Sequence, residues 1–596
     1  MIKKIPYGIA NYEMLKEGNY YFVDKTKYIE VLENLNSRYL FFLRPRRFGK
    51  SLFISILNYY YDINSKDKFE ILFKDTYIGK HPTELRNTLP VLKLNFSGIP
   101  VHGSMDEIEK AFNIHIRNSI RSFLNSYKNH FTRLKDIERE ILSMDNGSVM
   151  ISSLISYLDD LSINYYLLID EYDNFANNIL IEYGKDEYRK ITHSGGFLRS
   201  FFAVIKNGTE NRVIDRMFVT GVSPLVLSDV TSGMNIGDNI STRPIFNSMV
   251  GFTEKEKEEM IEYYIREGKI DKKDKESIEL IFKEYYNNYI FSPENGERIH
   301  NSDMVLYFIN NYIDYKKIPP ELIDPNIRTD YGKLRFLVIE NNRLNGNFTV
   351  LNEFIEKGES SGSLITLFSI GELIDKDKFL SLLYYLGLIT IKELLPGNLY
   401  KYEIPNQTVR TLLWEYIRKS VNETYGLRID TNYLLRQFLK LGFEGEWKEL
   451  FSFVFDEFYK AASIRDFIWR EEGIKMFFLA YTSMTEVYIV ESEPELNKGY
   501  GDIYFRKNWY QAEEIKYEYL IEIKYIKSSE IKGKDRGKVI ERKKEEAKEQ
   551  LERYEKTIDE RYNRRVPVFA KGKKAPELKK IIVIASSKKI EYMGEA

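Results

Sequence analysis

The sequence has no cysteine and only six histidines among its 596 residues. Without cysteine there can be no disulfide framework, no cysteine-bound zinc and no thiol nucleophile. Long apolar runs are also missing, since charged residues interrupt them well short of the ~20 residues that a bilayer crossing needs. The N-terminal MIKKIPYGIANYEML has two lysines but no apolar run behind them, so it does not indicate a signal peptide. We therefore expect a cytoplasmic protein without membrane contact.

Proline and glycine are scarce, with 16 and 34 residues, whereas 43% of the residues are hydrophobic. Enough apolar side chains are available to form cores, so disordered, collagenous and mucin-like classes are excluded. At ~100 to 200 residues per domain, the length predicts three or four domains of a soluble globular protein.

Net charge is nearly absent, with 88 Lys+Arg against 89 Asp+Glu, but the balance conceals an asymmetry. Residues 506–596 contain 25 basic and 17 acidic residues, which leaves 63 basic and 72 acidic residues in 1–505. Basic charge gathered at one end is typical of a surface that contacts phosphate. The alternative is a solvated helix face around ERKKEEAKEQLERYEK.

In residues 1–250, short β-rich runs alternate with helical segments. The runs are RYLFFLR (38–44), PVLKLNFS (90–97), NYYLLIDEYD (164–173) and RMFVTGVS (216–223). This alternation predicts an α/β domain whose parallel sheet is covered on both faces.

The rest of the chain divides into two further regions. In residues 251–440, apolar side chains recur at helical spacing, which predicts a mainly helical domain. Residues 441–596 begin with helical stretches, continue with TEVYIVESE, GYGDIYFRK and YEYLIEIKYIK, and end with a charged helix and KKIIVIASS. That order predicts a small α/β domain with a mixed sheet.

The strongest motif is PRRFGKS, which lies directly between a predicted strand and a predicted helix. In such a turn the backbone N–H groups and the helix N-terminus face phosphate, while a lysine reaches the β and γ phosphates. Gly49, Lys50 and Ser51 occupy the G-K-[ST] positions, and Ser51 would offer its hydroxyl to Mg²⁺. Arg44 stands where the first glycine of this phosphate loop is usually found.

Acidic and hydroxyl side chains follow the next two predicted strands. Asp170 and Glu171 end the apolar run NYYLLID, and carboxyl ends of parallel strands gather beside the phosphate loop. We expect Asp170 to hold Mg²⁺ and Glu171 to orient or deprotonate the attacking water. Thr220 and Ser223 are candidates for sensing the γ-phosphate, although hydroxyls at strand ends are also common in turns.

Together these segments resemble a known family. PYGIANYEMLKEGNYYFVDKTKYI, FFLRPRRFGKSLF, LLIDEYDN, FVTGVSPL and GFTEKE resemble, in this order, the bacterial AAA-ATPase-like family of predicted P-loop ATPases. The resemblance covers roughly residues 4–260 and implies that Arg44 is a family feature. It makes Asp24, Lys25 and Thr26 candidates for closing over the nucleotide; alternatively, they cap the helix that follows. Arg46 and Arg47 either neutralise transferred charge or form salt bridges.

A second constellation lies near the C-terminal end of the sequence. Residues i and i+2 of a strand point to one face, so Glu522 and Lys524 project together while Ile521 and Ile523 are buried on the other side. Asp502 lies on the preceding predicted strand and can approach Glu522 across a hairpin. Two carboxylates beside an ammonium group suit a Mg²⁺ site that positions water for phosphodiester hydrolysis.

This arrangement resembles the PD-(D/E)XK nuclease superfamily over about residues 440–590. The resemblance implies that Asp502 and Glu522 are metal ligands and Lys524 the catalytic lysine. It also assigns Gln550 as the polar residue of the following helix and Glu472 as the upstream metal ligand. Family members often have an aromatic residue and a histidine shortly after that acid, where this chain has Lys475 and Met476.

The preferred hypothesis is an ATP-hydrolysing protein with ATP and Mg²⁺ as its ligands, whose Mg-dependent nuclease domain acts on DNA or RNA. The alternative is a nucleotide-dependent switch whose degenerate nuclease domain binds nucleic acid without cleaving it. A nucleotide kinase is disfavoured, because the Asp-Glu pair points to water as the acceptor. A homo-oligomer is possible under each hypothesis.

Overall fold

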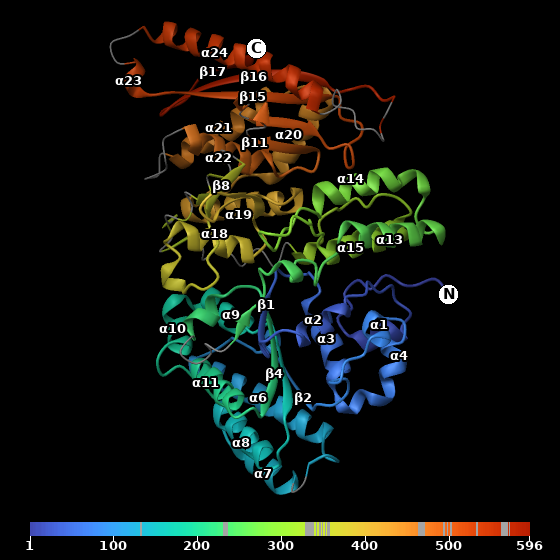
Figure 1. Cartoon of the computed structure of the whole chain (residues 1–596). Coiled ribbons are helices and arrows are strands. Elements are labelled where there is room, and N and C mark those ends of the chain that lie inside the picture. Colours follow the sequence, from blue (N-terminus) through green and yellow to red (C-terminus); the bar gives the residue numbers. More distant parts are fainter. Residues whose placement is uncertain are drawn as a thin grey trace.

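The computed structural model describes residues 1–131, 134–230, 237–327, 339–340, 343–344, 347, 350–351, 353–354, 358–462, 471–492, 495–496, 499–500, 503–531, 535–561, 570 and 572–596. The molecule is elongated, and three parts follow one another along its length (Figure 1). The N-terminal part lies at the bottom of the view, the helical part in the middle and the C-terminal part at the top.

The N-terminal part is built on a five-stranded parallel sheet with the order β2-β3-β4-β1-β5. Its strands are β1 (Tyr39–Leu43), β2 (Val91–Asn95), β3 (Tyr165–Asp170), β4 (Ile214–Gly221) and β5 (Asp238–Asn239). The first four lie on the predicted β-rich runs, and every residue of β3 is buried. A strand buried on both faces explains why NYYLLID has no alternation of apolar and polar residues.

Helices lie on both sides of this sheet in Figure 1. One group contains α1 (Tyr12–Glu17), α2 (Lys27–Glu33), α3 (Lys50–Tyr61), α4 (Phe69–Phe73) and α5 (Tyr77–Lys80). The other helices are α6 (Met105–Ser126), α7 (Leu134–Ser143), α8 (Gly147–Asp160), α9 (Asn174–Tyr183), α10 (Lys185–Thr192), α11 (Phe197–Glu210) and α12 (Leu225–Asp229). The predicted α/β fold with a covered parallel sheet is confirmed.

The middle part contains two groups of helices. They are α13 (Glu254–Arg266), α14 (Lys275–Tyr285) and α15 (Ser302–Tyr315), followed by α18 (Lys376–Tyr385) and α19 (Gln407–Tyr425). The helical prediction missed an antiparallel sheet with the order β8-β10-β9, formed by β8 (Glu359–Ser363), β9 (Thr390–Leu395) and β10 (Leu399–Glu403). Only the first two residues of β9 are buried, so its sequence shows no period of two.

The C-terminal part has a mixed sheet, as the sequence predicted, and its strand order is β11-β14-β15-β16-β17. Its strands are β11 (Tyr488–Ser492), β14 (Ile503–Lys507), β15 (Tyr517–Ile526), β16 (Glu577–Ser586) and β17 (Ile590–Glu595). Strands β14 and β15 are antiparallel, while β15 and β16 are parallel and joined through α24 (Arg536–Arg561). The sheet packs against α20 (Thr431–Glu444), α21 (Lys448–Ala462) and α22 (Glu471–Thr482), whose buried residues share one core with it.

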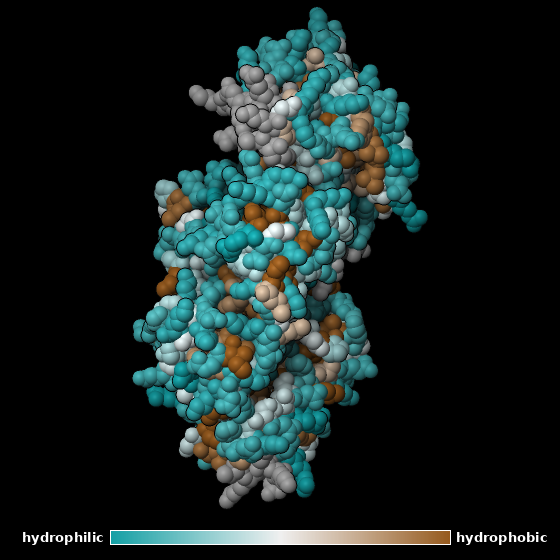
Figure 2. Space-filling model, turned by 90° about the vertical axis from the view of Figure 1, so that its right-hand side faces the viewer, coloured by the Kyte–Doolittle hydropathy of each residue, from teal (hydrophilic) through white to brown (hydrophobic). Residues whose placement is uncertain are grey.

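The face shown in Figure 2 is mainly hydrophilic, and its apolar side chains are dispersed along the length of the molecule. Within the described ranges, no helix combines the length and the apolar composition that a membrane crossing requires.

Candidate functional sites

The phosphate loop connects β1 to α3, which begins at Lys50. Two of its residues have left-handed backbone conformations, Arg47 with φ of 69° and Gly49 with φ of 95°. A Cβ atom at position 49 would meet no close neighbour, so the positive φ, rather than space, accounts for the glycine. This turn directs the chain into the first turn of α3, where backbone N–H groups have no partners within the helix.

The Lys50 side chain folds back over the loop. Its ammonium group donates hydrogen bonds of 2.9 Å to the carbonyl oxygens of both Arg44 and Pro45. Burial lowers the pKa of Lys50 to about 8, and the nearby carboxylates of Glu171 and Asp170 partly oppose that shift. The loop therefore holds a buried cation whose acidic neighbours come from β3.

The two acidic residues occupy the end of β3. Asp170 is 1% exposed, and the hydroxyl of Thr220 on β4 donates a 2.6 Å hydrogen bond to its Oδ1. Glu171 follows with a φ of 52°, which turns the chain away from the strand. Burial raises the pKa of Glu171. Because β4 lies between β3 and β1, Thr220 stands between the acidic pair and the phosphate loop.

A cavity of about 500 Å³ opens beside the loop. Its polar lining includes Arg46, Lys50, Ser51 and Glu171. Further lining comes from distant regions of the chain: the N-terminal segment, the turn before α13 and the start of α15 contribute Gly8, Ile9, Ala10, Phe22, Val250, Phe252, Ser302 and Leu306. Sequence analysis assigned none of these last contributors to the site, although Gly8, Ile9, Ala10, Phe22 and Phe252 lie in segments that resemble the family.

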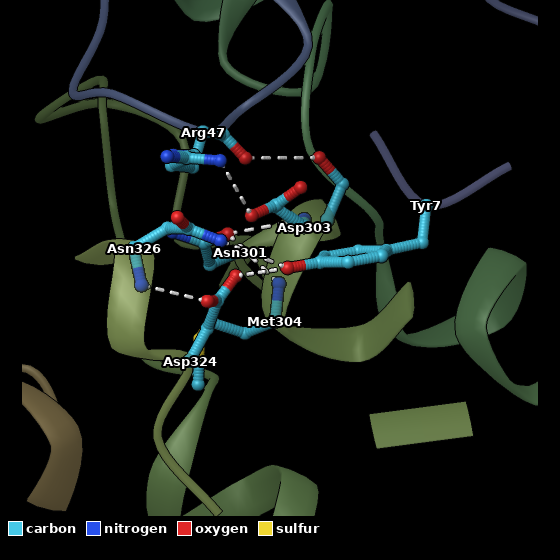
Figure 3. Close-up of polar contacts among 8 residues, drawn as sticks. Tyr7, Arg47, Asn301, Asp303, Met304, Asp324 and Asn326 are labelled. Atoms are coloured by element: carbon cyan, nitrogen blue, oxygen red, sulfur yellow. Dashed lines mark hydrogen bonds and ion pairs between the residues drawn. The ribbon is translucent and has the colours of Figure 1, made fainter. Parts of the chain in front are cut away.

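The start of α15 holds the phosphate loop by its backbone (Figure 3). The hydroxyl of Ser302 and the N–H of Asp303 donate hydrogen bonds of 3.4 Å and 3.3 Å to the carbonyl oxygen of Arg47. The Asp303 carboxylate also accepts a 3.5 Å hydrogen bond from the Arg47 guanidinium. Nearby, the Tyr7 hydroxyl donates to Asp324 at 2.7 Å, which ties the N-terminal segment to the middle part. The loop is thus in contact with the helical part.

Arg44, in the place of the usual glycine, joins the loop to its surroundings. It is 2% exposed, and its guanidinium lies 4.4 Å from the ring centres of both Phe42 and Phe291. It donates hydrogen bonds to the carbonyl oxygens of Ser241 and Phe246, at 2.6 Å and 2.8 Å. The geometry gives Arg44 a structural part in the loop, because both of its terminal nitrogens donate to backbone carbonyl oxygens of residues that do not line the cavity.

Four other predicted residues have contacts beyond the cavity. Ser223 lies against Asp173, whose carboxylate accepts a 2.9 Å hydrogen bond from the Ser223 N–H. Lys25 lines the cavity and forms a 2.6 Å ion pair with Glu256. Asp24 accepts hydrogen bonds from the N–H and the hydroxyl of Thr26, as a turn before a helix does.

In the C-terminal part, Glu522 and Lys524 form an ion pair of 2.7 Å on β15. The alternate residues Ile521 and Ile523 belong to the core shared with α20–α22, as predicted, while Leu520 packs with α24. Strand alternation therefore directs Glu522 and Lys524 toward the α24 side. The Glu522 side chain is 2% exposed and that of Lys524 18%, so the pair is shielded from water.

The remaining predicted nuclease residues are placed only in part. Gln550 lies on α24, and its buried Oε1 has no hydrogen-bond partner among the described residues. Asp502 lies outside the described residues, and so does the side chain of Glu472, which belongs to the first turn of α22. Within the part of the chain that the structure describes, no group of three or more acidic or histidine side chains is arranged to hold a metal.

Comparison with known proteins adds relatives for both ends of the chain. Residues 6–231 match the family described as predicted AAA-ATPase, and residues 469–592 match the PD-(D/E)XK nuclease superfamily. An uncharacterized protein from the vnfD 5′ region of Azotobacter chroococcum mcd 1 is 26% identical over 309 residues, which are 51% of this chain and 52% of that protein. The chain thus spans about half the length of this relative.

Two solved structures also show similarity. A Walker-type ATPase of Pyrococcus abyssi is 12% identical with a TM-score of 0.34, over 65% of this chain and 94% of that chain. Cdc6p from Pyrobaculum aerophilum is 13% identical with a TM-score of 0.25, over 70% of this chain and 96% of that chain.

Proposed function

We propose that this protein hydrolyses ATP and cleaves nucleic acid, because residues 6–231 match the predicted AAA-ATPase family and residues 469–592 match the PD-(D/E)XK nuclease superfamily. The proposal rests mainly on one observation: Lys50 and Glu171 line the same cavity. An ammonium group beside an acid, at the N-terminus of a helix, suits phosphate binding and transfer to water.

The cavity suits a nucleotide in size and in chemistry. Its volume of about 500 Å³ lies in the range of small-molecule sites. The loop would bind the phosphates, and the apolar lining from Ile9, Val250 and Phe252 would receive the base. In the presence of phosphate, the Lys50 ammonium would exchange the carbonyl oxygens of the loop for phosphate oxygens.

Ser51 and Asp170 would hold Mg²⁺, because a hydroxyl and a carboxylate are the hard oxygen ligands that this ion prefers. When bound, Mg²⁺ neutralises charge on the phosphate oxygens. Glu171 would accept a proton from the attacking water. The water oxygen bonds to the γ-phosphorus as the bond from that phosphorus to the ADP oxygen breaks, which yields ADP and phosphate.

For the C-terminal domain we propose cleavage of a phosphodiester by water. Glu522, with Asp502 and Glu472, would hold Mg²⁺. The ammonium of Lys524 would position the attacking water and stabilise the negative charge that develops on the phosphate. One phosphorus–oxygen bond forms with water as the bond to the leaving sugar oxygen breaks; the water loses a proton to solvent and the leaving oxygen takes one from solvent, which yields a phosphate monoester and a hydroxyl. The ion pair of Glu522 with Lys524 supports this assignment, since it keeps both groups on one face.

The contacts of the middle part support a coupling between the two activities. Helix α15, whose start holds the Arg47 backbone, packs on α14 through Phe308, with ring centres of Phe308 and Phe282 5.0 Å apart. On α14, Glu284 pairs with Arg506 of β14. Beside this ion pair, the amide of Asn508, the residue after β14, donates a 3.1 Å hydrogen bond to the hydroxyl of Tyr285 at the end of α14. We propose that the nucleotide state reaches the nuclease strands by this route.

The test is a set of assays on the purified full-length chain. ATP turnover is expected to be lost in Lys50→Ala and Glu171→Gln. Mg²⁺-dependent cleavage of DNA or RNA is expected to be lost in Glu522→Ala and Lys524→Ala, and retained in Lys527→Ala, which changes an exposed lysine just beyond β15.

Two results would contradict the proposal. ATP turnover that is absent from the wild type or unchanged in Lys50→Ala would refute the ATPase. Nucleic-acid binding without cleavage in the wild type would instead favour the nucleotide-dependent switch.

A further inference from the structure

Two asparagines at the start of α9 form a hydrogen-bonded chain that ends at Glu171. The Nδ2 of Asn174 donates a 2.8 Å hydrogen bond to Glu171 Oε2. The Nδ2 of Asn178 donates a 2.7 Å hydrogen bond to Asn174 Oδ1. All three side chains line the cavity beside the phosphate loop. The two amides therefore lie in the same cavity as Glu171, the residue proposed to take the proton from the attacking water.

The chain of hydrogen bonds fixes which way the Asn174 amide faces. An asparagine side chain carries an acceptor and a donor group that can exchange places by a flip. Because the ionised Glu171 carboxylate can only accept, the Asn174 Nδ2 must face it, and the Asn174 Oδ1 is left to accept from the Nδ2 of Asn178. Asn178 can do this because it lies four residues further along the same helix, on the same side.

The backbone around Glu171 is also held in place. Its φ of 52° is uncommon for a residue with a side chain and persists only where the surroundings impose it. Here the next N–H, of Tyr172, donates a 3.0 Å hydrogen bond to the carbonyl oxygen of Thr220 on β4. The Asn174 N–H donates a 2.9 Å hydrogen bond to the carbonyl oxygen of Glu171 itself. The turn thus fixes the Cα of Glu171, and the Asn174 amide restrains its carboxylate.

We propose that Asn174 is a positioning residue that orients the Glu171 carboxylate for proton transfer from the attacking water, with Asn178 fixing the orientation of the Asn174 amide. This inference rests on the proposed ATPase function. Asn174 engages Oε2, so Oε1 is the oxygen that takes the proton. A catalytic group that is misplaced by about 1 Å can lose about a hundredfold in rate, so an amide that removes this freedom has a measurable effect.

The decisive variant is Asn174→Asp in the full-length chain. Aspartate has nearly the same shape, but its ionised carboxylate cannot donate to Glu171 and repels it. A negative charge in the first turn of a helix favours the helix, so folding should not suffer. We expect kcat for ATP to fall by about 10- to 100-fold while KM changes less than about twofold. Asn178→Ala should lower kcat by a smaller factor.

Two controls separate positioning from general damage to α9. Asn177→Ala removes the same kind of side chain from the same helix, but the Asn177 amide donates to Asp173, at 3.1 Å. Its kcat should stay within about twofold of the wild type. In a Glu171→Ala background, Asn174→Asp should cause no further loss in single-turnover hydrolysis, because residues that act as a unit are not additive.

The outcomes distinguish this inference from the ATPase proposal. If the wild type turns over ATP and Lys50→Ala does not, an unchanged kcat in Asn174→Asp overturns the inference alone. Equal losses in Asn174→Asp and Asn177→Ala, or additive losses in the Glu171→Ala background, overturn it as well. If the wild type turns over no ATP, the proposed function fails and the inference fails with it.

Discussion

The two candidate sites are assembled in different ways. At the phosphate site, side chains from the β1–α3 loop, β3 and β4 meet because parallel strands end at one edge of the sheet. At the nuclease site, Glu522 and Lys524 are two residues apart on β15 and pair at 2.7 Å through strand alternation alone. The first arrangement depends on the order of the strands in space, whereas the second is local.

The difference also extends to what encloses each site. Residues of the middle part contact the phosphate loop and line its cavity, so its environment depends on a second region of the chain. The pair on β15 lies between its own sheet and α24. Changes at the middle part should therefore alter ATP chemistry directly and nucleic-acid cleavage through contacts with the C-terminal part, such as the pair of Glu284 with Arg506.

The largest expected effect is that of Lys50→Ala on ATP turnover. The change removes the buried cation that faces the phosphates, and loss of one preorganised charge typically costs about 10²- to 10³-fold in kcat. Cleavage measured without ATP should remain, since Glu522 and Lys524 are formed locally. Parallel assays of phosphate release and of nucleic-acid cleavage test this. Equal loss of both activities would show that the structure of the nuclease site depends on the ATP site.

A somewhat smaller effect is expected for Glu522→Gln on cleavage. The amide keeps the size of the side chain but removes the charge that we propose binds Mg²⁺, and it leaves the Lys524 ammonium without its carboxylate. Loss of about 10²-fold in cleavage is expected, with ATP turnover within about twofold of the wild type. Gel assays at fixed Mg²⁺ measure it, with Lys527→Ala as the matched control. A cleavage rate equal to that of the wild type would remove Glu522 from the site.

Arg506→Ala should affect only the coupling. Arg506 pairs with Glu284 of α14 and with Glu491 of β11, so its loss removes the ion pair that joins β14 to the helical part. Both activities should persist, but the change in cleavage rate on adding ATP should shrink by about fivefold, which is a usual size for coupling between sites. Lys440→Ala, which breaks an exposed ion pair with Glu449 in the same part of the chain, is the control. An unchanged ATP dependence in Arg506→Ala would contradict the route through α14.

The smallest effect is expected from a change outside both sites, at the start of the middle part. The Nε2 of His300 lies 2.7 Å from Glu254 Oε2, and burial lowers the pKa of His300. In the unfolded chain the imidazole takes up a proton at about pH 6.5, whereas burial disfavours that protonation in the folded chain. The free energy of unfolding should therefore fall as the pH drops below about 6.5. His300→Gln keeps an N–H donor and does not titrate. When the pH is lowered from 7 to 5, the Tm of both proteins should fall, and the fall should be about 2 °C smaller in His300→Gln than in the wild type.

The control for this prediction is the difference between the two proteins at pH 8, where His300 is neutral in both the folded and the unfolded chain. Above pH 8, the difference in Tm between the wild type and His300→Gln should therefore stay constant. A wild type and a His300→Gln variant that lose the same Tm on acidification would show that His300 does not titrate on unfolding.

Several features were accessible from sequence because they are local. A glycine, a lysine and a serine between an apolar strand and a helix predict a turn of the kind that binds phosphate, and the acidic pair after a later apolar run strengthens that prediction. The acidic pair after β3 and the alternation around Glu522 are likewise set by neighbouring residues. The sequence alone therefore determined the phosphate loop, the sheet of the N-terminal part and the pair on β15.

The tertiary structure decided what surrounds those motifs. The contacts of Arg44 with Phe291, of Arg47 with Ser302 and of Glu171 with Asn174 could not be foreseen, because each depends on how a loop packs or how an amide is turned. The sheet of β8, β10 and β9 was also missed. Only part of β9 is buried, so its sequence does not alternate between apolar and polar residues. A motif such as the phosphate loop is set by residues adjacent in the sequence. A cavity wall is formed when distant segments pack against one another, and the hydrophobic periodicity of the sequence does not show which segments meet.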